Sequence, residues 1–192
     1  MGIHCFLLEP TDRVRQSLRR FVFGSKGGAC SVAKIGIHDA SIQIEDGTGR
    51  PDEWPHDDPR WPKSCPCGYV FTDSDEWQLF IEPIYVADGQ QYTLRSAPPG
   101  AMWFADWVDI DRWKGPDGRT LMVMTPGGQW MVDGVASNCT KPNDTEHRCW
   151  IRHGTPPSIT VDKNGNTCAA GAGSILCGSY HGFLRNGELS PA

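Results

Sequence analysis

Two short groups of soft metal ligands lie far apart in the sequence. A Cys-Pro-Cys-Gly run occupies positions 65–68. Near the C-terminus a third thiol, Cys177, is followed four residues later by the imidazole of His181. Three thiols and one imidazole form the kind of ligand set that Zn²⁺ takes in a closed tetrahedral site. The sequence therefore predicts one structural zinc ion, held by Cys65, Cys67, Cys177 and His181, that joins the middle of the chain to its last residues.

Other cysteines and histidines offer alternatives to this ligand set. Cys168 competes for the third ligand position. A second site is conceivable in the segment 138–153, whose candidate ligands are Cys139, Cys149, His147 and His153. Its simpler interpretation is a polar surface loop. For every thiol, the competing hypothesis is a buried free cysteine that packs as a small hydrophobic residue.

No signature of a known catalytic centre accompanies these ligands. The deaminase pattern His-x-Glu with Pro-Cys-x-x-Cys, the protease pattern His-Glu-x-x-His and the phosphate-binding loop are all missing from the sequence. Thiol–imidazole pairs can be assembled from Cys149 with His153 or from Cys177 with His181. We therefore predict no catalytic residue and favour a binding or structural protein, with a metal- or thiol-dependent hydrolase acting against a host factor as the alternative.

Composition narrows the class of protein further. The formal net charge is -5, which disfavours a general nucleic-acid binder, and no apolar run approaches the length of a membrane span. The first residues do not form a secretory signal, so the eight cysteines favour thiols and metal over disulfides, and we expect a cytoplasmic protein. Four arginines within 13–20 and the acidic stretch 45–76 are most simply solvated faces. The alternative is internal pairing or contact between subunits, so an oligomer is compatible with the sequence.

One amphipathic helix is predicted near the N-terminus. Thr11 and Asp12 are typical of a helix start, and Val14, Leu18 and Phe21 follow at spacings of four and three. Gly24 would end this helix. We expect residues 1–30 to form a strand-and-helix arm and residues 31–192 to form a single β-rich domain.

The rest of the sequence indicates short strands and tight turns. Alternation predicts strands at 41–45, 77–86 and 158–161, and a hairpin is expected around the turn at 126–128. Asp88-Gly89 and Asn186-Gly187 are typical of reversals between strands. The predicted fold class is therefore α+β and β-rich, with small irregular antiparallel sheets, one N-terminal helix and a metal that holds them together.

Several motifs of the C-terminal half resemble a known group of proteins. They are 124–130 (MTPGGQW), 133–140 (DGVASNCT), 147–154 (HRCWIRHG), 167–175 (TCAAGAGSI) and 180–184 (YHGFL), together with Cys65-Pro66-Cys67. This pattern resembles uncharacterised proteins encoded by tailed bacteriophages and prophages. The resemblance implies a viral protein with a metal site and implies no reaction. It leads us to expect a virion accessory protein or a binder of a host component, found in the virion or the host cytoplasm, whose partners are other phage structural proteins or a host protein.

Overall fold

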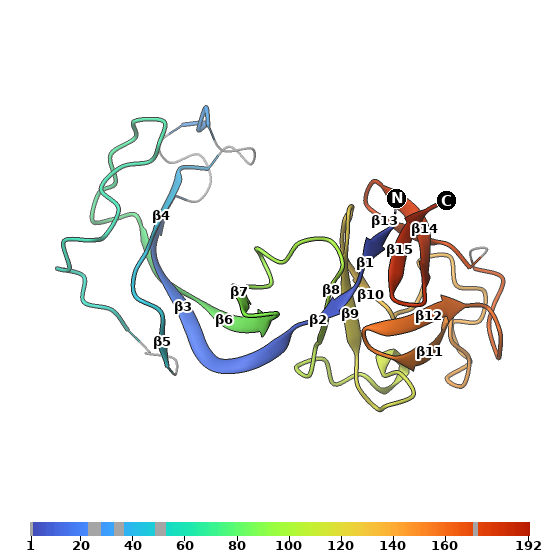
Figure 1. Ribbon diagram of the computed structural model, residues 1–192. Helices are drawn as coiled ribbons and strands as arrows, with labels where there is room; N and C mark the ends of the chain where they lie inside the picture. The colour runs from blue at the N-terminus through green and yellow to red at the C-terminus, as the bar shows by residue number, and fades with distance from the viewer. Residues whose placement is uncertain (1, 23–27, 33–36, 49–52, 171–172) are drawn as a thin grey trace. The chain divides into compact units, whose positions relative to one another are not determined.

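The chain folds into two compact units, each described here by itself. The computed structural model describes residues 2–22, 28–32, 37–48, 53–170 and 173–192. The inserted unit comprises Pro10–Tyr85, and the terminal unit comprises Met1–Glu9 together with Val86–Ala192 (Figure 1). The chain thus passes between the units twice. This division differs from the predicted arm of residues 1–30 and single domain of residues 31–192.

The predicted N-terminal helix is wrong, because the segment forms a strand of thirteen residues, β3 (Glu9–Phe21). Burial alternates along β3, so that Val14 and Leu18 are buried together with the polar Gln16 and Arg20. A spacing of four residues between two apolar side chains fits a strand as well as a helix. The polar side chains at the intervening buried positions concealed the period of two. Gly24, the predicted helix end, lies outside the described residues.

The inserted unit is built around β3. Its antiparallel neighbour is β4 (Asp39–Gln43), with Ser17 opposite Gln43 and Phe21 opposite Asp39. The short β5 (Gly47–Thr48) continues this pairing along β3. On the other side of β3 lies β6 (Glu76–Ala87), whose last two residues already belong to the terminal unit, as does β7 (Gln90–Tyr92), which follows it after a turn. The turn residues Asp88 and Gly89 have φ values of 48° and 75°, as a tight reversal requires.

The terminal unit contains three small sheets. The first has the order β1-β15-β14-β13, the second β10-β9-β8-β2, and the third is the hairpin β11-β12. All their pairings are antiparallel except that of β2 with β8. The strands are β1 (Ile3–His4), β2 (Phe6–Leu7), β8 (Ala101–Phe104), β9 (Leu121–Thr125), β10 (Gly128–Met131), β11 (Ile151–Thr155), β12 (Ser158–Asp162), β13 (Ile175–Cys177), β14 (Tyr180–Arg185) and β15 (Glu188–Pro191).

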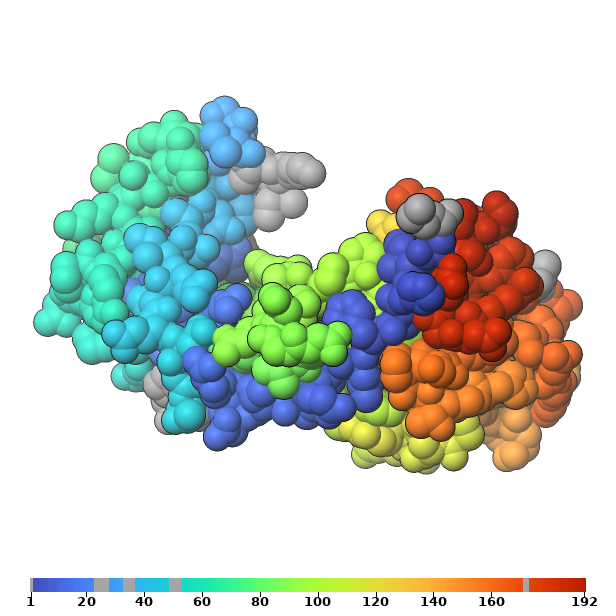
Figure 2. Space-filling model, in the orientation of Figure 1, coloured from blue at the N-terminus to red at the C-terminus, as the bar shows by residue number. Residues whose placement is uncertain are grey.

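Both ends of the chain belong to the same sheet of the terminal unit. β1 pairs with β15 in the register Ile3 to Leu189, and Figure 2 shows the first residues, in dark blue, packed against the last strands, in red. The predicted hairpin of β9 and β10 is confirmed, as is the one at Asn186-Gly187, where φ is 49° and 72°. A single turn of 3₁₀ helix, η1 (Asp111–Trp113), is the helical element among the described residues.

The two units bury their apolar side chains differently. The terminal unit has a small cluster around Cys149, Cys168 and Ala170 and one large core between the sheets, lined by Met102, Leu121, Val123, Val132, Ile159, Val161, Ile175, Tyr180, Leu184 and Leu189. The inserted unit has two small clusters: one combines Leu18, Ile44 and Trp61, and the other includes two cysteines. Domains below about 80 residues rarely gain enough stability from such cores alone and usually need cross-links or a metal. In the described part of the chain, no helix has the length and apolar character needed to cross a membrane.

Candidate metal centres

The first group of ligands lies in the inserted unit and joins three segments. Cys30 comes from the segment after β3, His38 immediately precedes β4, and Cys65 and Cys67 belong to the Cys-Pro-Cys-Gly turn. Their four ligand atoms all lie within 4.8 Å of one another. The turn is closed by hydrogen bonds from the Cys65 N–H to the Tyr69 carbonyl (2.8 Å) and from the Gly68 N–H to the Cys65 carbonyl (2.9 Å). Gly68 has a φ of 96°, which favours glycine. The turn therefore aims both thiols at one point.

The spacing of the sulfur atoms matches the S–S edge of a zinc tetrahedron, and the imidazole nitrogen lies closer to its thiol than the S–N edge. With Zn–S bonds near 2.3 Å and Zn–N bonds near 2.0 Å, such a tetrahedron has S–S edges of about 3.8 Å and S–N edges of about 3.6 Å. The Sγ atoms of Cys30 and Cys65 lie 3.7 Å apart, and Nδ1 of His38 lies 3.1 Å from Sγ of Cys67. A disulfide would need its sulfur atoms about 2.05 Å apart. The arrangement therefore fits a metal and not a disulfide.

The surroundings of the first group favour a thiolate. Burial disfavours the charged form of Cys65, but hydrogen bonds from the backbone N–H groups of Cys67 and Asp39 outweigh it and lower the pKa of Cys65 to about 6. His38 stacks on the Tyr69 ring at 4.2 Å between centroids, which fixes the plane of the imidazole. Because zinc binds thiolates, a thiol with a lowered pKa binds it with less competition from protons.

The second group lies in the terminal unit and repeats the same chemistry. Cys139, His147, Cys149 and Cys168 place their ligand atoms within 4.8 Å of one another. Sγ of Cys168 lies 3.9 Å from Sγ of Cys139 and 3.7 Å from Sγ of Cys149. Nε2 of His147 lies 3.1 Å from Sγ of Cys139 and 3.8 Å from Sγ of Cys149. The two sulfur–sulfur distances and the His147–Cys149 distance again follow the edges expected for a tetrahedral zinc site.

Residues around the second group hold its ligands in place. Nδ1 of His147 lies 2.6 Å from the Asp144 carbonyl oxygen, so the ring donates its proton there and leaves the lone pair of Nε2 for a metal. Burial opposes ionisation of Cys168, but the backbone N–H groups of Thr140 and Ala170 lower its pKa to about 6. The ammonium group of Lys163 donates to the carbonyls of Cys149 and Ala170. Its positive charge offsets the net negative charge of three thiolates around Zn²⁺.

The structure separates the four ligands predicted for a single site. Cys65 and Cys67 meet Cys30 and His38, whereas Cys177 and His181 belong to the terminal unit. There the Cys177 thiol donates to the Gln129 carbonyl, 3.4 Å away, and Nε2 of His181 lies 3.1 Å from the Ser174 hydroxyl. Each group of ligands therefore lies within one unit, and neither group joins the middle of the chain to its last residues.

The alternative ligands are largely brought together. Cys139, His147, Cys149 and Cys168 form the second group, while His153 is exposed on β11 and pairs with Asp162 at 2.9 Å. Cys168 was predicted as an alternative ligand beside Cys65 and Cys67 but lies in the second group. Cys30 and His38 were not among the predicted ligands.

One signal could have revealed both groups. Cys30 precedes His38, and Cys139 precedes His147, with seven residues between ligands in each case. A further pair with one intervening residue, Cys65 with Cys67 or His147 with Cys149, completes the resemblance between the two sets. This spacing assigns five of the eight cysteines and leaves Cys5, Cys168 and Cys177, of which Cys168 joins the second group in the structure.

Each group offers four ligands, the number that fills the tetrahedral coordination of Zn²⁺ in a closed structural site. Comparison with protein-family models, with curated proteins and with solved structures gives no match for this chain. The ligand geometry is therefore the main guide to function.

Proposed function

We propose that this protein binds two structural zinc ions, one in each unit, and acts by binding a partner. The observation that carries the proposal is the presence of two sets of three cysteines and one histidine, each with its ligand atoms within 4.8 Å. Zinc is favoured over other metals because thiolate and imidazole ligands in a tetrahedron suit it. Binding is favoured over catalysis because four protein ligands leave the metal no open position.

The resemblance to proteins of tailed bacteriophages supports a more specific role. We propose a virion accessory protein, or a phage protein that binds a host component. Two rigid zinc-stabilised units fit this role, because a surface that is ordered before binding pays less conformational entropy on association. Mass spectrometry of purified phage particles tests the first possibility directly, since an accessory protein must be found in them.

The metal content tests the central claim. The purified protein should contain two zinc ions per chain by inductively coupled plasma mass spectrometry. Removing them with a chelator should unfold both units, because a structural zinc site contributes about 10–16 kcal/mol of binding free energy that depends on the fold. A protein that keeps its near-ultraviolet circular dichroism after complete zinc removal would contradict the structural role.

A further inference from the structure

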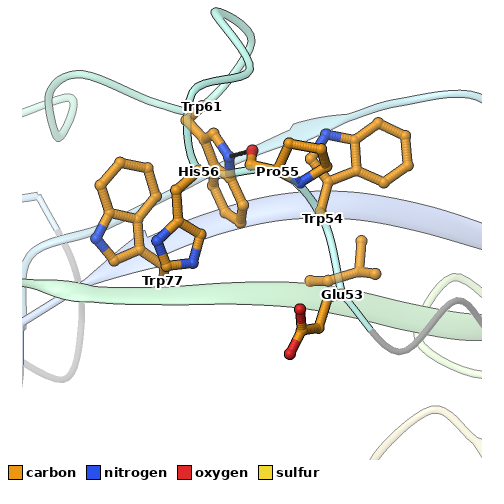
Figure 3. Close-up of a pocket in the computed structure, with 7 residues that line it drawn as sticks. Glu53, Trp54, Pro55, His56, Trp61 and Trp77 are labelled. Atoms are coloured by element: carbon orange, nitrogen blue, oxygen red, sulfur yellow. Dashed lines mark hydrogen bonds between the residues drawn. The ribbon is translucent and has the colours of Figure 1, made fainter.

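A cavity of about 640 Å³ lies in the inserted unit, between the loop that contains residues 53–61 and strand β6. Its walls carry three tryptophans and a histidine, with a carboxylate at the rim (Figure 3). The lining residues are Glu53, Trp54, Pro55, His56, Trp61, Trp77 and Leu79. This volume falls within the range of about 300–1,000 Å³ that is typical of small-ligand sites.

The aromatic walls are fixed by contacts within the protein. The Trp61 and Trp77 rings are nearly perpendicular, at 83°, with their centroids 5.0 Å apart, and the His56 ring stacks on Trp77 at 4.9 Å. The indole N–H of Trp61 donates to the Pro55 carbonyl (2.7 Å), and that of Trp54 donates to Asp58 (2.9 Å). The indole N–H groups of these two walls are thus already satisfied. His56 stacks on Trp77, the Arg20 guanidinium lies over the same ring, and Trp61 is buried, so a ligand would meet mainly the partly exposed Trp54 ring and the exposed His56 ring. A ligand would meet walls that need little further ordering.

Two polar side chains at the cavity have no such partner. Glu53 and His56 are exposed, and neither side chain forms a hydrogen bond or ion pair with a residue that the structure describes. A carboxylate accepts several hydrogen bonds, and an imidazole both donates and accepts. The site therefore combines flat apolar surfaces with hydrogen-bonding groups that remain available to a ligand.

The charges already present select the kind of ligand. The Arg20 guanidinium lies 3.6 Å from the Trp77 ring centroid, and the Arg60 guanidinium lies 5.1 Å from that of Trp54. Because these rings already face cations, a cationic ligand would add like charge beside them. A wholly apolar ligand would remove Glu53 and His56 from water without replacing their hydrogen bonds, which is costly.

We infer that this cavity binds a neutral saccharide. The C–H face of a sugar ring matches the partly exposed Trp54 ring, and sugar hydroxyl groups match Glu53 and His56. The inference names a ligand class for the binding role proposed above and rests on that role, although it does not depend on the identity of the metal. No covalent step is involved.

The test uses the full-length, zinc-loaded protein on an array of neutral oligosaccharides that covers glucose, galactose, mannose and N-acetylglucosamine linkages. At least one glycan should bind, and titration with that glycan should change the tryptophan fluorescence. Tetramethylammonium chloride serves as the cationic probe and should leave the fluorescence unchanged. Absence of any glycan signal, or saturation by tetramethylammonium, would overturn the inference.

Substitutions at the rim localise the binding, and Glu53→Gln does so without removing any of the ring contacts that fix the walls. Glu53→Gln and His56→Ala should each weaken glycan binding at least tenfold, whereas Glu76→Gln, an exposed change on β6 outside the cavity, should not. Unchanged affinity in both rim variants would place the ligand elsewhere and reject this site. Zinc content measured on the same samples separates the outcomes, because two zinc ions without glycan binding reject only the saccharide.

Discussion

The sulfur atoms of Cys30 and Cys65 lie 3.7 Å apart, although 35 residues separate them in the sequence. This distance is too long for a disulfide and fits two ligands of one zinc ion. The pair joins the segment after β3 to the Cys-Pro-Cys-Gly turn. Together with Val22 and Phe71, these cysteines form one of the small cores seen in the described part of the inserted unit, so a metal bound here would couple its binding to the folding of this unit.

Loss of one ligand in the inserted unit should therefore remove one zinc ion and unfold that unit alone. We expect Cys30→Ser to lower the zinc content from two ions per chain to one. Amide hydrogen exchange should become fast in β4 and around Phe71, while β9 and β14 keep their protection. Cys5→Ser is the matched control, because burial raises the pKa of Cys5 to about 11 and keeps it a thiol away from both groups. Equal zinc content in the two variants would contradict the assignment.

The reciprocal change in the terminal unit should have the reciprocal effect. Cys168→Ser removes a ligand that lies 3.7 Å from Cys149 and 3.9 Å from Cys139. We expect one zinc ion to remain, and exchange to accelerate in 136–170 but not in β3 or β4. If either single substitution releases both metals, the two sites are not independent.

The support of His147 by the Asp144 turn gives a subtler prediction. The Asp144 carboxylate accepts hydrogen bonds from the backbone N–H groups of Glu146 (2.9 Å) and His147 (3.2 Å). Asp144→Ala should loosen this turn and weaken zinc binding at the second site by about 10–100-fold, the usual effect of losing a supporting residue. Competition with a chromogenic chelator measures this, and Glu146→Ala is the exposed control. An unchanged affinity would show that the turn does not orient the imidazole.

The strand assignment of β3 can be tested at neighbouring arginines. Arg20 is buried, with its guanidinium over Trp77, and it donates to the Thr72 carbonyl. Arg20→Ala should reduce the free energy of unfolding of the inserted unit by on the order of 2 kcal/mol. Arg19 pairs with Asp39 at a partly exposed site, so Arg19→Ala should cost less than about 1 kcal/mol. Denaturant titration compares them, and equal losses would contradict the alternation of burial.

A pH dependence is expected from Asp133, which lies 3.0 Å from the buried Arg152. Burial raises the pKa of Asp133 to about 6, although Arg152 opposes the shift. Between about pH 4 and pH 6 the folded state therefore holds a proton that the unfolded chain has released. The contribution of Asp133 to stability should fall as the pH rises through this window. The difference in unfolding free energy between the natural chain and Asp133→Asn should change there and be constant above it; a difference that is constant throughout would refute the shift.

The sequence was sufficient for the local reversals and insufficient for the long-range pairings. Asn186-Gly187 and Asp88-Gly89 predicted their turns because each encodes a backbone conformation within two residues. Val14 and Leu18 are four residues apart, which fits both the helical period of about 3.6 and the strand period of two. The burial of Gln16 and Arg20, seen only in the structure, shows that the period is two.

The metal ligands illustrate the same limit. Cys65 and Cys67 were recognised from their own turn, but their partners come from another segment of the chain. In the sequence, only the spacing that Cys30 and His38 share with Cys139 and His147 distinguishes them from Cys177 and His181. The choice follows from the division into units, which depends on which strands pair.

The hydroxyl group of Thr11 donates to the carbonyl of Ile84 at 2.6 Å, so the first and last strands of the inserted unit run side by side where this unit begins and ends. A segment whose two ends are neighbours can be removed or inserted as a unit, and we call Pro10–Tyr85 a cassette in this sense. Replacing Pro10–Tyr85 with a short glycine-containing link should leave a foldable, single-zinc protein, and the excised cassette should be transplantable into a surface hairpin of an unrelated host.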